Sequence, residues 1–83
     1  MNKKITVRNN FDKTVYCVLS GEADFDEQLS EVFSFQKGQG FSAHMSETAV
    51  IVTDYFHGEE RARFDIISIE DTDQAVQLYW REV

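Results

Sequence analysis

The residues best able to do chemistry in this chain are carboxylates, and they occur in groups. Five of them fall within ten residues that contain no lysine or arginine: Glu22, Asp24, Asp26, Glu27 and Glu31. A second group lies in segments with the composition of turns: Asp54, Glu59, Glu60, Glu70, Asp71 and Asp73. Such arrays can occupy lysine and arginine sites that otherwise hold nucleic-acid phosphates. They predict a surface that binds a basic protein, with Tyr55 as a neighbouring aromatic contact.

The histidine and cysteine residues give little support for catalysis or metal binding. His44 and His57 are the only imidazoles, and neither has a second histidine or a cysteine within about four residues, as a zinc site would require. Cys17 lies in the apolar run TVYCVLS, where a thiol most often behaves as a small buried hydrophobic group. No nucleophile, base and pocket can be named together. We therefore expect a protein that is not an enzyme and that carries no metal or cofactor.

The charge of the chain is unevenly distributed. It has 15 acidic and 8 basic residues, for a formal net charge of -7. The first twenty residues hold four of the basic residues and one acid, a net charge of +3, which leaves -10 for the remainder. A field of that sign repels nucleic acid and anionic lipid and steers a protein toward basic surfaces. We therefore predict neither direct nucleic-acid binding nor membrane binding. Solubility is the alternative explanation of the same acidity.

Length and composition indicate one packed domain over residues 1–83. A chain of 83 residues is too short for two ordinary domains, and 42% hydrophobic with 13% aromatic residues is typical of a globular core. No run of about 18 apolar residues is present, so we expect no membrane span and no signal peptide. A single cysteine cannot form an internal disulfide, which favours a reducing, cytoplasmic setting.

Alternation of apolar and polar residues dominates the chain and is typical of β-strands. It predicts strands over residues 3–8, 14–19, 31–36, 41–45, 48–56, 61–69 and 75–82. The runs 14–19 and 48–56 are apolar on both faces and should be central strands. We expect an all-β fold, a small antiparallel sandwich or barrel of six to seven strands.

Three local features refine this prediction. Residues 37–40 contain two glycines and would form the turn of a hairpin. The apolar alternation switches parity near Ile66, which predicts a β-bulge. Lys3, Lys4, Arg61 and Arg63 are placed to discourage pairing between exposed strand edges.

One short helix is expected near residues 23–31. Phe25, Leu29 and Val32 recur at helical spacing there, and Ser20 or Asp24 could cap the first turn. An irregular acidic loop is the alternative for this segment. The last segment also has an alternative, a helix capped by Thr72, although its aromatic content favours a strand.

These observations lead to two hypotheses about function. The first is an acidic, non-enzymatic inhibitor that blocks the basic surface of a nucleic-acid-handling complex. In size and charge alone, the chain is similar to phage-encoded inhibitors of bacterial defence, such as anti-CRISPR and anti-restriction proteins. The alternative is a structural or self-assembling β module, such as a small virion or scaffold component, whose two-faced strands would suit a homodimer.

Overall fold

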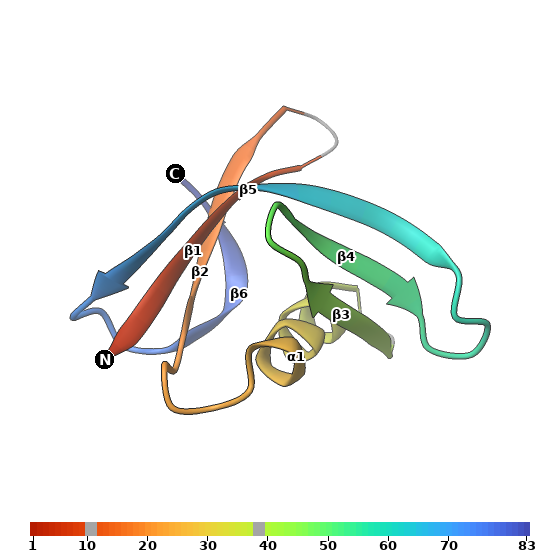
Figure 1. The fold of residues 1–83 in the computed structure, drawn as a ribbon, viewed down its shortest axis with the longest axis horizontal. Helices are drawn as coiled ribbons and strands as arrows, with labels where there is room; N and C mark the ends of the chain where they lie inside the picture. The colour runs from red at the N-terminus through yellow and green to blue at the C-terminus, as the bar shows by residue number, and fades with distance from the viewer. Residues whose placement is uncertain (10–11, 38–39) are drawn as a thin grey trace.

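The computed structural model describes residues 1–9, 12–37 and 40–83, which form six strands and one helix (Figure 1). In chain order these elements are β1 (Asn2–Arg8), β2 (Thr14–Leu19), α1 (Phe25–Lys37), β3 (Phe41–Met45), β4 (Ala49–Asp54), β5 (Glu60–Thr72) and β6 (Gln77–Glu82). All paired strands are antiparallel. The all-β prediction, with one short helix, is confirmed.

The six strands form one sheet in the order β3-β4-β5-β1-β2-β6, curled into a half-barrel. The long strand β5 bends where its partners change. Its first half pairs with β4 up to Asp65, and its second half pairs with β1 from Asp65 to Thr72. Figure 1 shows β5 arching over the molecule and joining the two parts of the sheet. The predicted central strands, β2 and β4, both lie inside the sheet.

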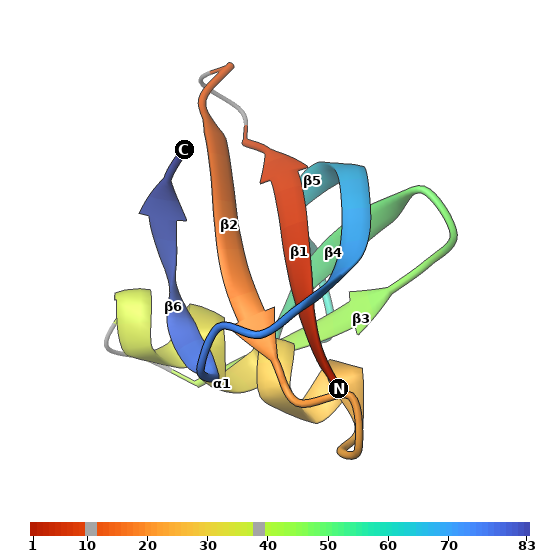
Figure 2. The ribbon, with the colours of Figure 1, turned by 90° about the vertical axis from the view of Figure 1, so that its left-hand side faces the viewer.

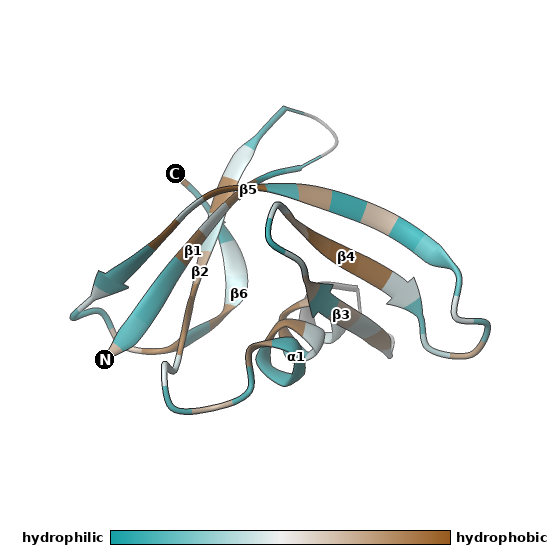
Figure 3. Ribbon diagram, viewed as in Figure 1, coloured by the Kyte–Doolittle hydropathy of each residue, from teal (hydrophilic) through white to brown (hydrophobic). Residues whose placement is uncertain are grey.

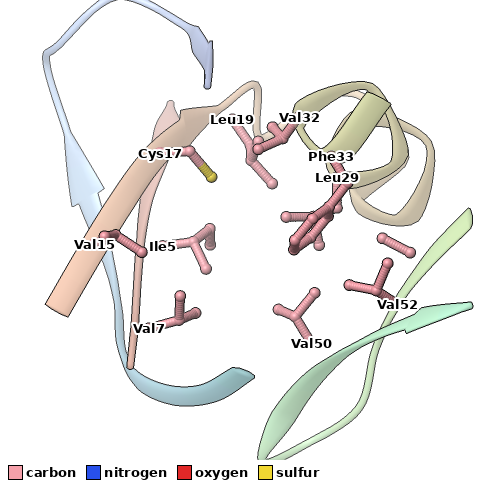
Figure 4. Packing of buried hydrophobic residues seen from close by; sticks show 11 residues of the cluster. Ile5, Val7, Val15, Cys17, Leu19, Leu29, Val32, Phe33, Val50 and Val52 are labelled. Carbon is pink, nitrogen blue, oxygen red and sulfur yellow. The ribbon is translucent and has the colours of Figure 1, made fainter. Parts of the chain in front are cut away.

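The core fills the concave side of this sheet beneath α1. Its buried apolar residues come from β1, β2, α1, β3 and β4 (Figure 4): Ile5, Val7, Val15, Cys17, Leu19, Leu29, Val32, Phe33, Ala43, Val50 and Val52. Phe33 on α1 makes edge-to-face contacts with Phe64 on β5 and Trp80 on β6, at ring-centroid distances of 5.2 and 5.5 Å. These rings connect the interior strand β5 with the edge strand β6 through the helix.

The helix is longer than the sequence predicts, and the strand expected over residues 31–36 is wrong. α1 continues to Lys37 because Leu29, Val32 and Phe33 form one buried helical face. The helix start is as expected, since Asp24 Oδ1 accepts a hydrogen bond from the Glu27 N–H. The hairpin turn expected at 37–40 is replaced by the end of the helix at Lys37, and residues 38–39 lie outside the described residues.

The bulge expected near Ile66 is confirmed. Thr6 on β1 pairs with Ser68, whereas the next residue, Val7, pairs with Ile66, so Ile67 has no partner in the ladder. The final segment forms a strand, β6, and the helical alternative is excluded. The connection from β5 to β6 crosses the outer face of β1 and β2 (Figure 2), where the Asn2 side chain donates a hydrogen bond to the Gln74 carbonyl.

Candidate functional site

Two groups of predicted acidic residues meet at one end of the molecule. Gly21 approaches the N-terminus so closely that a Cβ there would meet the Met1 carbonyl oxygen and lie 3.9 Å from Lys3 Cε. Lys3 in turn forms an ion pair with Asp71. The loop before α1 and the end of β5 therefore lie beside the N-terminus (Figures 1 and 2). We call this surface the acidic end and define it as Glu22, Asp24, Asp26, Glu27, Glu70, Asp71 and Asp73.

Some carboxylates of the acidic end form ion pairs with basic side chains, and others do not. Asp71 is held by Lys3, whose hydrogen bond and charge lower the pKa of that carboxyl group. By contrast, none of the described ion pairs includes Glu22, Glu27 or Glu70, and all three residues are exposed. The Glu27 carboxylate also lies in the first turn of α1, where the helix dipole favours negative charge.

Asp26 has a structural task, because it belongs to a row of acceptors that covers the outer edge of β3. Asp26 Oδ1 accepts a hydrogen bond from the Met45 N–H at 2.8 Å. Ser30 Oγ accepts from the Ala43 N–H at 2.8 Å, and Ser34 Oγ accepts from the Phe41 N–H at 3.3 Å. We call these three acceptors, Asp26, Ser30 and Ser34, the helix ladder.

The helix ladder works because two repeats nearly match. Four residues of helix rise about 6 Å, and two residues of strand advance about 6.8 Å. Acceptors at every fourth position of α1 can therefore meet donors at every second position of β3. Alternate N–H groups at a sheet edge have no strand partner, so α1 serves as a substitute strand.

A shallow, open hollow of about 460 Å³ lies next to the start of α1. Its lining residues are Gly21, Ala23, Asp24, Phe25, Asp26 and Met45. Asp26 is already engaged, since its second oxygen lies 2.9 Å from His44 Nδ1. A lining that combines apolar groups with two aspartates suits the alkyl stem and charged head of a lysine or arginine side chain.

A further group of predicted residues lies at the opposite end of the long axis, in the connection between β4 and β5 (Figure 1). Asp54 organises this turn: one of its carboxylate oxygens accepts hydrogen bonds from the N–H groups of His57 and Phe56, and the other accepts one from Arg61. The backbone hydrogen bonds lower the pKa of Asp54 from 3.8 to about 2. Gly58 completes the turn with a φ of 68°.

The acids of this turn are paired with arginines, unlike the three free glutamates of the acidic end. Glu59 lies 3.7 Å from the Arg61 guanidinium, and Glu60 lies 2.8 Å from that of Arg63. Glu31 is exposed on α1, one helical turn after Glu27. We therefore assign it neither to the acidic end nor to the β4–β5 turn. The predicted partner-binding residues thus form separate surfaces.

Sequence reasoning missed several exposed apolar side chains. Phe56 is 84% exposed, and its ring packs edge-to-face against that of Tyr55, which is 69% exposed. Ile67 and Ile69 on β5 are 48% and 45% exposed. The parity switch near Ile66 was the available signal for the isoleucines, because a bulge changes which side chains face the core.

The cysteine thiol and the two histidine side chains do not form a common site. Cys17 is fully buried in the core, and its burial raises the pKa of the thiol to about 12, so the thiol stays protonated at neutral pH. His44 and His57 are exposed on β3 and in the β4–β5 turn. Among the residues with described positions, no three His, Cys, Asp or Glu side chains are grouped to hold a metal ion.

Comparison with known proteins finds no matching family model, no matching curated protein and no matching solved structure. Within the described ranges, no helix has both the length and the apolar character needed to cross a membrane. The geometry of the acidic end and of the strand edges therefore carries the argument about function.

Proposed function

We propose that this protein is a non-enzymatic binding module that uses its acidic end to occupy the basic surface of a partner protein. In the form we favour, the partner handles nucleic acid, and the bound module inhibits it by taking the place of phosphates. A phage inhibitor of bacterial defence, of the anti-CRISPR or anti-restriction type and acting in the cytoplasm, would have this chemistry.

One observation carries the proposal. Glu22, Glu27 and Glu70 are exposed, and none of the described ion pairs occupies them. Three described basic side chains are committed elsewhere: Lys13 to Glu82, and Arg61 and Arg63 to acids near the β4–β5 turn. Lys3 lies at the acidic end, but it is paired with Asp71. Free carboxylates gathered on one surface give the local negative potential that a lysine- and arginine-rich site attracts.

The self-assembly alternative has weaker support. It was based on strands that are apolar on both faces, such as β2. The residue on the second face of β2, Val18, is fully buried within a single chain. The chain's own β5–β6 connection crosses that face (Figure 2), so the pattern needs no second copy to explain it.

Affinity capture with matched charge variants tests the proposal. The tagged protein is incubated with a nuclease-treated bacterial lysate at low and high salt, and bound proteins are identified by mass spectrometry. The test variant is Glu22→Lys with Glu27→Lys. The control is Glu59→Lys with Glu82→Lys, which changes the net charge equally but outside the acidic end.

We expect a basic nucleic-acid-binding protein that is released by salt and lost with the test variant but kept with the control. Adding the purified module to that protein should then displace its nucleic acid. Equal capture by both variants would contradict a role for the acidic end. Capture of nothing but the module itself would favour self-assembly.

A further inference from the structure

We propose that the second half of β5, residues 67–72, accepts an extended basic strand of the partner protein. This inference rests on the proposed function and adds where and how the partner docks. It starts from the edges of the sheet, which are the places where another chain can add hydrogen bonds.

One side of this half-strand has no described strand beside it. β4 pairs with β5 only as far as Asp65, and the last backbone hydrogen bond on that side runs from the Ile66 N–H to the Thr48 carbonyl. Beyond Ile66, the strand that pairs with β5 is β1, on the other side. Alternate N–H and C=O groups of an antiparallel strand face each side, so those on the open side are available to an added strand.

The other described edges of the sheet are partly covered or carry charges. The helix ladder covers β3, and α1 also packs against β6 at the other end of the sheet. The first half of β5 carries the exposed charges of Arg61 and Arg63. Figure 3 shows hydrophilic segments along this part of the strand. Charged side chains on an edge discourage pairing. On the open side, residues 67–69 have neither form of protection, and the charges that follow them, Glu70 and Asp71, are acidic.

The side chains along this edge define the chemistry of the incoming strand. Ile67 and Ile69 are two residues apart, lie on one face and are about half exposed. The acidic residues Glu70 and Asp71 follow on the strand, and Asp73 comes directly after it. A strand that alternates apolar residues with lysine or arginine would cover the isoleucines with one face and bring its cations to Glu70 with the other. Asp71 shares the face of the isoleucines and is paired with Lys3.

Charge also decides between such a strand and a second copy of this chain. In an antiparallel pair of two β5 edges centred on Glu70 and Asp71, these residues of one copy would lie next to the same residues of the other. Like charges at close range across a ladder are destabilising. A basic strand meets no such repulsion.

Titration with synthetic peptides tests the proposal. The ligand is a capped peptide of alternating lysine and valine, added to the isotope-labelled full chain and followed by NMR at low salt. Two control peptides replace the central valine with proline, which cannot donate to a ladder, or every lysine with glutamate. Protein variants are Ile67→Thr with Ile69→Thr, and Val76→Thr as a control at another exposed apolar residue.

We expect the lysine-valine peptide to shift the amide signals of residues 67–72 and to slow their hydrogen exchange. The isoleucine double variant should bind about tenfold more weakly, and the Val76 variant should bind normally. The proline and glutamate peptides should bind much more weakly than the parent peptide.

Each other outcome overturns a specific statement. Equal binding of the lysine-valine and proline peptides, with shifts confined to residues 22–27, would refute strand addition and leave the proposed function intact. No binding of any basic peptide would count against both. A concentration-dependent dimer of the free protein in sedimentation, abolished by the isoleucine variant, would show that a second copy is the occupant.

Discussion

The outer edge of β3 and the open side of the second half of β5 are both ends of hydrogen-bonded ladders, but the chain treats them differently. At β3, side chains of Asp26, Ser30 and Ser34 accept the N–H groups that no strand accepts. At β5, no described strand pairs with residues 67–72 on the side away from β1, and Ile67 and Ile69 are about half exposed.

The difference shows what α1 contributes to the fold. The helix fills the concave side with Leu29, Val32 and Phe33 and presents its polar acceptors to β3. A short protein with a single helix can cover only the edges that the helix reaches. The edge left open adjoins the acidic end, where we propose that a partner supplies the missing pairing.

The largest effect is expected from removing the apolar anchor of the helix. Leu29→Ala deletes a fully buried side chain and should cost about 2 to 5 kcal/mol of unfolding free energy. Urea unfolding followed by circular dichroism measures this loss. Because the helix covers β3, hydrogen exchange should accelerate at the amides of Ala43 and Met45 more than at those of residues 67–72.

Val76→Ala, at an exposed residue, is the control and should change stability by less than about 0.5 kcal/mol. A cost below about 1 kcal/mol for Leu29→Ala would show that α1 is not anchored in this way.

A smaller effect is expected from removing one acceptor of the helix ladder. Ser30→Ala leaves the partly buried Ala43 N–H without its acceptor, which costs about 1 to 3 kcal/mol. The higher helix propensity of alanine returns about 0.5 kcal/mol, so the net loss should be roughly 1 to 2 kcal/mol. Ser68→Ala on β5 is the matched control, because no hydrogen bond of the Ser68 side chain is described, and it should change stability by less than about 0.5 kcal/mol. Equal losses of unfolding free energy for the two serine variants would contradict a stabilising role of the helix ladder at the edge of β3.

The strands were largely predictable from the sequence, whereas the helix ladder was not. Period-two alternation located β1, β2, β4 and most of β5, since each of these strands buries one or both faces. In α1, Phe33 fits a strand when it is grouped with Phe35 and fits a helix when it is grouped with Leu29. Local spacing cannot choose between these patterns, because the decision depends on the helix packing against a strand that comes later in the chain.

The candidate site was predictable only as a set of residue types. The sequence identified every carboxylate of the acidic end, but it also grouped them with Asp54, Glu59 and Glu60 at the far end of the molecule. Their separation depends on the length and bend of β5. The proximity of the loop before α1 to the end of β5 depends on the close approach of Gly21 to Met1 and on the Lys3–Asp71 ion pair. These are tertiary contacts with no signature in local composition.

The smallest expected effect is on the pH dependence of stability, and it comes from two aspartates, Asp54 and Asp71. One is held by backbone N–H groups and the other by a lysine side chain. Asp54, like Asp26, accepts backbone N–H groups, whereas Asp71 at the open edge is held by the Lys3 side chain. Both folded-state pKa values are lowered, so each carboxylate stabilises the fold above its unfolded pKa of about 4 and loses that contribution as the pH falls through its folded value. For Asp54 that window extends from roughly pH 4 to about 2.

Asp54→Asn and Asp71→Asn should each flatten the acid limb of a stability profile measured by urea unfolding between neutral pH and pH 2. Salt distinguishes them: raising it should erase the effect of Asp71→Asn, because an exposed ion pair is screened, and should leave most of the effect of Asp54→Asn. If salt erased both effects equally, the backbone hydrogen bonds of Asp54 would not be the cause of its lowered pKa. The lowered pKa of Asp54 would then come from its charged neighbours, as that of Asp71 comes from Lys3.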